Sequence, residues 1–146
     1  MAAARDQAAR IVRETANDEA APDAGAQLAD QLRTHGRMRT TEQRKKPTGG
    51  YTVARIPPTA ADTLAEGEFN RFYIRALCRR AIEERIPNLI IYQAKDVQQP
   101  RPDSEWMVGT VTSPPALLED LRTHQGTDTM YGLPGGPNSG LSVQLP

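Results

Sequence analysis

The residues of this chain best suited to chemistry are arginines and lysines, which lie in two groups. One group follows i,i+4 spacing, so on a helix it would form a stripe along one side. The other lies in residues 33–55, which contain seven Lys and Arg residues and one acidic residue, Glu42, and so carry a net charge of +6. Guanidinium groups bind phosphates or carboxylates bidentately. The candidate partner-binding residues in these groups are Arg37, Arg39, Arg44, Lys45, Lys46, Arg71, Arg75 and Arg79.

The basic residues leave two kinds of partner open, nucleic acid and an acidic protein surface. Nucleic-acid binding is typical of domains with excess positive charge, interleaved aromatic residues for base stacking, or a helix-turn-helix pattern. Here 18 Lys and Arg balance 18 Asp and Glu, and aromatic residues make up only 5% of the chain. The sequence therefore favours an acidic protein partner or a solvated face over nucleic acid.

The closing stretch GLPGGPNSGLSVQLP, residues 132–146, contains enough glycine to raise the question of a phosphate-binding loop. A Walker loop needs GxxxxGK[ST] between a strand and a helix, so that backbone N–H groups and the lysine face the phosphates. The lysine is missing here, two prolines remove donors, and no helix follows. The stretch instead predicts a turn-rich lead and then a short docking strand, whose apolar residues alternate: Leu141, Val143 and Leu145.

Groups that could act in catalysis or metal binding do not converge in this sequence. His35 and His124 lack metal-ligand spacing and are predicted at the surface. Cys78 is expected to be a small, half-buried helix residue with no identifiable base. Asp103, Ser104 and Glu105 are expected at an acidic loop tip beside Arg101. Together with Glu119 and Asp120 they could supply paired carboxylates, but nothing in the sequence brings them together, and all are expected to be solvated. We therefore expect no enzymatic activity, no metal and no cofactor.

Composition indicates a soluble protein with a small core. The 146 residues support one domain, and a hydrophobic content of 38% is below that usual for globular domains. The single cysteine permits no internal disulfide and suits a reducing compartment. The N-terminus lacks the apolar run of a signal peptide, and no apolar run approaches the length of a membrane span. We expect a chain made in the cytosol, with no membrane partner.

The elements that would position these groups centre on one helix, predicted over residues 68–85. Thr63 and Glu66 have the spacing of a capping box before it, and Gly67 is a possible break. Thr59 and Asp62 offer a weaker, earlier start, which lacks the usual Glu or Gln. The arginine stripe begins opposite the apolar side of this helix and drifts towards its margin, and Pro87 ends the helix. The predicted buried side, with Ile74 at its edge, consists of Phe69, Phe72, Tyr73, Ala76, Leu77 and Ala81.

Two strands and a second helix follow in the sequence. Residues 88–97 have strong β propensity, residues 106–111 form a second strand, and the two are predicted to pair as a hairpin across a loop. The second helix is predicted to begin with Ser113 as N-cap and Pro114 at its first position, and to end at Gly126. Its expected buried stripe is Leu117, Leu118 and Leu121.

The N-terminal part of the chain contains little apolar sequence. Residues 1–20 predict a short amphipathic helix, and residues 26–32 predict a second helical patch. Residues 34–50 are polar and basic, and their proline and glycines predict a linker or binding arm. Residues 51–56 alternate as in a short strand.

Together these elements predict an α+β fold: a small core of a central helix, a two-stranded β-hairpin and a second helix, with extended N- and C-terminal arms. The expected boundaries are an N-terminal arm over residues 1–56, the core over 57–126 and a C-terminal arm over 127–146. The strand Leu141–Leu145 is offered to a neighbouring sheet edge by strand addition. Val143 should then be paired, either within the core or across a chain boundary.

Four segments carry a resemblance to known sequences: EFNRFYIRALCRRAIEE (68–84), YQAKDVQQPRPDSE (92–105), ALLEDLR (116–122) and LPGGPNSGLSVQLP (133–146). They resemble a group of small uncharacterised proteins from head-gene neighbourhoods of tailed bacteriophages and prophages. The resemblance covers roughly half of the chain and implies a setting, with no catalytic residues to carry over.

That setting gives the leading functional expectation. The chain would be a non-enzymatic virion structural protein, a head-associated or capsid-decorating component that binds the major capsid protein or neighbouring copies of itself through extended arms. It would be made in the host cytoplasm and reside in the virion. The alternative is a small nucleic-acid-binding accessory protein that uses the basic linker and the arginine stripe.

Overall fold

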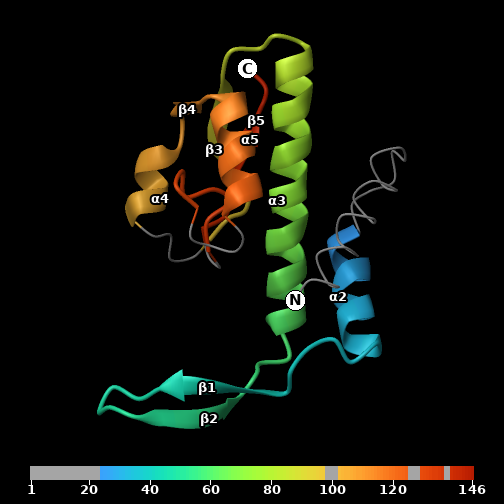
Figure 1. The fold of residues 1–146 in the computed structure, drawn as a ribbon, viewed down its shortest axis with the longest axis vertical. Coiled ribbons are helices and arrows are strands. Elements are labelled where there is room, and N and C mark those ends of the chain that lie inside the picture. The colour runs from blue at the N-terminus through green and yellow to red at the C-terminus, as the bar shows by residue number, and fades with distance from the viewer. Residues whose placement is uncertain (1–23, 98–101, 125–128, 137–138) are drawn as a thin grey trace. The chain divides into compact units, whose positions relative to one another are not determined.

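The computed structural model of the chain describes residues 24–97, 102–124, 129–136 and 139–146 (Figure 1). It contains helices and small antiparallel sheets, so the predicted α+β class is confirmed. These residues form two compact units that divide between Glu66 and Gly67. The helix predicted over residues 1–20 and the helix end predicted at Gly126 lie outside the described residues.

The first unit contains α2, Ala24–Thr34, which confirms the predicted helical patch at residues 26–32. Its apolar residues recur at helical spacing and share one buried side: Leu28, Ala29 and Leu32. The helix ends in a Schellman motif, in which Gly36 has a φ of 58° and the N–H of Arg37 donates to the carbonyl of Leu32 at 3.1 Å. Glycine adopts this left-handed conformation without a Cβ penalty, so the helix stops there.

Two strands follow, β1 (Thr41–Lys45) and β2 (Tyr51–Arg55), which pair antiparallel. β2 confirms the predicted strand, whereas the basic segment predicted to be a linker contains β1. The connecting turn is closed by the N–H of Lys46, which donates to the carbonyl of Gly50 at 3.0 Å. Gly49 and Gly50 have φ values of 91° and 76°. The glycines that suggested a linker therefore supply the positive φ that the hairpin turn requires.

The longest element is α3, Ala60–Glu83, which begins well before the predicted helix start. The capping box predicted at Thr63 and Glu66 is wrong, because both residues already lie inside the helix. The Oγ1 of Thr63 instead donates to the carbonyl of Thr59 at 3.2 Å. Gly67 is a helical residue, so the predicted break at this position is also wrong.

The end of α3 agrees with the sequence, which places Pro87 just beyond it. A second Schellman motif terminates the helix: Arg85 has a φ of 57°, and the N–H of Ile86 donates to the carbonyl of Ala81 at 2.8 Å. Proline cannot continue a helix because it lacks an N–H and its ring clashes with the preceding turn. The chain therefore leaves α3 in the direction of the first core strand.

The buried side of α3 in the second unit differs from the predicted one. The residues that are fully buried include Ile74, Cys78 and Ala81, and Arg71 is only 5% exposed. The predicted apolar side, apart from Ala81, is partly or largely solvent-exposed: Phe69, Phe72, Tyr73, Ala76 and Leu77. Small side chains permit close approach to neighbouring elements, and the polar head of Arg71 finds backbone acceptors. A helical wheel that ranks residues by apolarity alone predicts neither the close packing of small side chains nor the burial of an arginine.

The second unit contains a three-stranded antiparallel sheet in the order β4-β3-β5. The central strand β3, Leu89–Gln93, confirms the first predicted strand, and β4, Val111–Thr112, pairs with it as the predicted hairpin requires. β5, Leu141–Gln144, pairs along the other side of β3, with Val143 opposite Ile91. The expected pairing of Val143 is thus confirmed, and it occurs within the chain's own sheet. Residues 141–144 belong to the core rather than to an extended arm.

A short helix, α4 (Pro102–Met107), replaces the first part of the strand predicted at residues 106–111. Proline at the start of a helix loses no hydrogen bond, and acidic residues in the first turn interact favourably with the helix dipole. Asp103 and Glu105 occupy that turn, so the residues expected in a loop are helical. Gly109, with a φ of 83°, then turns the chain into β4.

The second predicted helix is confirmed as α5, Pro114–Thr123, with Ser113 at the N-cap and prolines in its first turn. Figure 1 shows α5 in the second unit with α3 and the sheet strands. Its leucine stripe is buried as predicted and joins residues from α3, β3 and β5 in one apolar core. The buried residues of this core are Ile74, Cys78, Ala81, Leu89, Ile91, Leu117, Leu118, Leu121, Leu133, Leu141 and Val143.

Replacing Gly67 with alanine tests the continuity of α3. An added Cβ at this position would meet nothing within 4 Å, and alanine is favoured over glycine in a helix interior by about 1 kcal/mol. We expect Gly67→Ala to raise the free energy of unfolding by about 0.5–1 kcal/mol, measured by urea denaturation. As a control, Gly140→Ala should destabilise, because Gly140 has a φ of 65° and its Cβ would lie 2.6 Å from the carbonyl of Lys95. Unchanged stability for Gly67→Ala would contradict a continuous helix.

Candidate partner-binding surfaces

Arg71, the first residue of the predicted arginine stripe, lies inside the second unit. Its Nη2 donates to the backbone carbonyl of Leu121 at 2.6 Å and also to that of His124. These carbonyls lie at the C-terminal end of α5, where a helix leaves acceptors unsatisfied and its dipole favours a cation. The guanidinium is therefore used within the fold, so the prediction that Arg71 contributes to a partner-binding surface is wrong.

The other arginines of the stripe have different surroundings. The guanidinium carbon of Arg75 lies 5.1 Å from the centre of the Phe72 ring, a cation–π geometry, and the residue is half-buried. Arg79 is exposed. The spacing of the three arginines correctly places them on one helix, yet one stabilises the core, one packs on an aromatic ring and one faces solvent. They do not form a single binding surface.

Arg71 and Arg79 form a matched pair for testing these roles, since both are arginines on α3. We expect Arg71→Ala to lower the free energy of unfolding by about 2–4 kcal/mol, because it removes charged hydrogen bonds and leaves buried carbonyls without a donor. Arg79→Ala should change it by no more than about 0.5 kcal/mol. Urea denaturation of both variants provides the measurement. Equal effects of the two substitutions would contradict the structural role of Arg71.

The C-terminal candidates lie in the core sheet. Leu141 is 1% exposed, Val143 is 0% exposed, and Leu145 is half-buried against the core. Asn70 of α3 holds this strand: its Nδ2 donates to the carbonyl of Leu141 at 2.7 Å, and its Oδ1 accepts from the hydroxyl of Ser142 at 2.7 Å. The three apolar side chains are therefore turned to the chain's own core, and the strand pairs with β3 of the same chain at the edge of the sheet.

Asp120 is a buried structural residue, contrary to the predicted solvated charge. Its side chain is 2% exposed, and its carboxylate accepts from the backbone N–H groups of Met130 and Tyr131, each at 2.9 Å. Its Oδ1 lies 2.8 Å from Nδ1 of His124. Burial raises the pKa of the carboxyl, and the hydrogen bonds outweigh it, so the pKa lies below its ordinary value. The resulting stabilisation is present above the ordinary pKa and is lost as the pH falls through the lowered one.

The remaining polar candidates divide by exposure. Asp103, Glu105 and Glu119 are exposed, as predicted, although they lie on helices. Ser104 is buried, so its prediction as a solvated group is wrong. His35 is exposed, and its Nδ1 lies 3.0 Å from the carbonyl of Gln31. Among the residues that the structure describes, no three His, Cys, Asp or Glu side chains gather into a possible metal site.

Cys78 lies fully buried in the core, whereas the sequence predicted a half-buried position. Burial raises the pKa of its thiol to about 11, because the thiolate would lose its hydration. The thiolate is the nucleophilic form of cysteine. The buried thiol is therefore protonated at neutral pH, and it packs as a small apolar group.

Thiol labelling tests this environment. At pH 8 we expect Cys78 in the native protein to react with 5,5′-dithiobis(2-nitrobenzoic acid) at least about a hundredfold more slowly than in urea, because a pKa of about 11 leaves little thiolate. The rate should rise with pH above 8. The urea-unfolded chain is the internal control for reagent quality. Rapid labelling of the folded chain at pH 7 would contradict a buried, protonated thiol.

The basic candidates of the first unit lie on or beside the β1–β2 hairpin, and all of them are exposed: Arg37, Arg39, Arg44, Lys45 and Lys46. Strand pairing sorts the hairpin residues into two faces, because side chains alternate along each strand. One face contains Glu42 and Arg44, whose Oε1 and Nε lie 2.6 Å apart, with Thr52 and Ala54. The other, here called the basic apolar face, contains Thr41, Gln43, Lys45, Tyr51, Val53 and Arg55.

Only Lys45 of the basic apolar face was among the predicted site residues; the two apolar residues of this face were not. Tyr51 and Val53 are each 68% exposed, and Lys45 lies directly opposite Tyr51 in the register. Their alternation in YTVAR was visible in the sequence. What the sequence did not reveal was the partner strand, which places a lysine beside the tyrosine.

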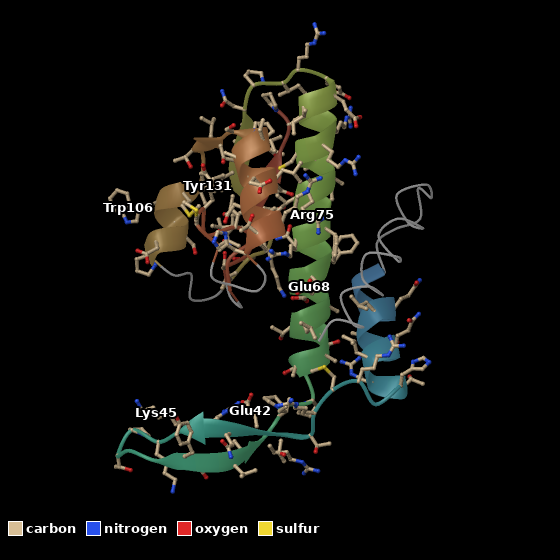
Figure 2. All side chains as sticks on the ribbon, in the orientation of Figure 1. Glu42, Lys45, Glu68, Arg75, Trp106 and Tyr131 are labelled. Atoms are coloured by element: carbon tan, nitrogen blue, oxygen red, sulfur yellow. The ribbon has the colours of Figure 1, made fainter. Side chains whose placement is uncertain are left out.

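The second unit also exposes large apolar side chains that sequence reasoning missed. Trp106 is 83% exposed, and Figure 2 shows it projecting outward from α4. Val108 and Val111 are 43% and 59% exposed. Both were expected in the strand over residues 106–111, but Val108 follows the end of α4 and Val111 lies in the edge strand β4. Close to them, a hollow is lined by Gln93, Asp96, Val97, Glu105 and Val108.

Comparison of this chain with protein-family models, with curated proteins and with solved structures found no match. None of the helices in the described part of the chain combines the length and apolarity needed to cross a membrane. The functional inference therefore rests on the surfaces of the two units, of which the hairpin presents basic residues together with the exposed apolar side chains of Tyr51 and Val53.

Proposed function

We propose that this chain is a non-enzymatic virion structural protein, a head-associated or decorating component of a tailed phage, which binds neighbouring subunits through the β1–β2 hairpin. The observation that carries the proposal is the exposure of that hairpin, in which every strand residue except Ala54 is exposed. The resemblance of residues 68–146 to proteins of phage head-gene neighbourhoods supplies the setting.

The physical chemistry of the hairpin supports a binding role. An isolated two-stranded hairpin is marginally stable in water, because it has no apolar layer to pack against. Tyr51 and Val53 present such a layer on one face and leave it exposed. Burying this face against another protein contributes roughly 25 cal/mol per Å² of apolar area and orders the hairpin at the same time. Repetition over a symmetric shell makes weak single contacts sufficient.

The polar groups of the interior support a role without catalysis. Arg71 and Asp120 are engaged with backbone groups, and the thiol of Cys78 is buried and protonated. Catalytic sites typically bring titratable groups together in a cleft with a free position for substrate. Here the buried side chains of Arg71 and Asp120 instead bind backbone groups and hold helices and loops in place.

A second candidate function is nucleic-acid binding, and one observation favours it. Arg39 and Arg55 line a hollow at the base of the hairpin, and the exposed ring of Tyr51 could stack on a base. The net charge of +6 in residues 33–55 would bind phosphates with a strong salt dependence. The zero net charge of the whole chain argues for the protein partner first.

Incorporation into particles tests the proposal. In a phage or prophage that carries this gene, the chain should be detected in purified particles by quantitative mass spectrometry. Tyr51→Ser with Val53→Ser should reduce its amount at least about tenfold, because two apolar side chains lose their buried contact. The matched control is Thr52→Ala on the opposite face, which should leave the amount unchanged.

Two outcomes would overturn the proposal. One is the absence of the wild-type chain from purified particles. The other is incorporation that the double substitution leaves unchanged. If the chain is absent from particles and binds duplex or single-stranded DNA with an affinity that falls steeply with salt, the nucleic-acid function takes its place.

A further inference from the structure

The charges of this chain are separated along its sequence although they sum to zero. Residues 33–55 carry a net charge of +6, whereas the second unit, residues 67–146, is nearly neutral, with nine Asp and Glu against eight Lys and Arg. Part of its negative charge is concentrated in one stretch: residues 96–119 contain four carboxylates, all of them exposed, against Arg101 alone. Surfaces of opposite charge attract and orient one another on encounter. The chain therefore contains both halves of a charge-complementary pair.

The basic half has a defined shape. On the basic apolar face of the hairpin, Lys45 and Tyr51 are paired in the register, and Val53 and Arg55 continue that face along β2. The opposite face neutralises part of its own charge through the ion pair of Arg44 and Glu42. The basic apolar face is thus the side of the hairpin that combines exposed apolar side chains with positive charge. This face therefore fits a binding surface that is both acidic and apolar.

An acceptor of that kind lies in the second unit. The hollow between the end of β3 and α4 has Val97 and Val108 in its lining, together with the carboxylates of Asp96 and Glu105. No lysine or arginine is among its lining residues in the described part of the chain. Trp106, the most exposed large apolar residue of the described chain, follows Glu105 on α4. Apolar side chains bordered by carboxylates are the complement of the basic apolar face.

We propose that the basic apolar face of one copy of this chain binds the hollow of a second copy, with Tyr51 and Val53 against its valines and Lys45 and Arg55 against Asp96 and Glu105. The inference rests on the proposed function, because it names a second copy as a neighbouring subunit. The two surfaces differ, so the contact is heterologous. The resulting dimer keeps one free hairpin face and one free hollow, so the contact repeats into a ring or an open chain.

A pair of variants tests this head-to-tail contact. The hairpin variant carries Lys45→Glu and Tyr51→Ser, and the hollow variant carries Asp96→Lys and Glu105→Lys. All four positions are exposed, so the fold should tolerate these changes. In sedimentation velocity at rising concentration, the wild-type chain should form dimers and larger species, and added salt should weaken them. Each variant alone should remain monomeric.

Mixing the two variants gives the sharpest expected result. The intact hairpin of the hollow variant can bind the intact hollow of the hairpin variant, and no further copy can then add. The mixture should therefore form a 1:1 dimer and stop at that size. Glu119→Lys, an exposed charge reversal on α5 outside the hollow, is the matched control and should associate like the wild-type chain.

Three results would overturn the inference: a wild-type chain that stays monomeric at high micromolar concentration, a mixture that stays monomeric, or variants that still associate alone. These failures are distinguishable from failure of the proposed function. A monomeric chain whose incorporation into particles still requires Tyr51 and Val53 would bind a different virion protein. A chain that associates head to tail and is absent from particles would retain the contact and lose the function.

Discussion

The second unit depends on a buried cation held by backbone carbonyls. Arg71 extends from α3 to the last carbonyls of α5, where the helix end supplies both free acceptors and negative potential. Asp120 on α5 does the converse and accepts from the N–H groups of Met130 and Tyr131. Two opposite charges on neighbouring elements thus satisfy backbone groups that would otherwise be buried without partners. The apolar core closes around this arrangement.

This use of charge explains why the aromatic residues of α3 are not its core. Once Arg71 faces α5, its helical neighbours Ile74 and Cys78 must face the interior as well, because they lie on the same side of the helix. Phe72 is then turned towards the outer side, where Arg75 covers its ring. The orientation of α3 about its own axis therefore decides which of its residues are buried and which remain at the surface.

The two units expose different kinds of surface. The first unit presents a hairpin whose strands bury almost nothing, and the second presents α4 with an exposed tryptophan. A short hairpin gains little from its own cross-strand contacts, so a packed partner would stabilise it considerably. These exposed apolar side chains are a stronger argument for a function in assembly than any single polar group.

The sequence by itself determined the α+β class, the strands β2 and β3, the helix α5 with its leucine stripe, and the presence of pairing at Val143. These features arise from local patterns, namely alternation, helical spacing and proline position, which act within a few residues. Only the tertiary structure decided that Arg71 and Asp120 are buried, that residues 41–45 form a strand and that β5 lies in its own sheet. Arg71 and β5 depend on partners distant in the sequence, the carbonyl of Leu121 for Arg71 and Ile91 for Val143. Asp120 and residues 41–45 depend on segments beyond a connecting turn or loop, and the pattern within each segment does not specify its partner.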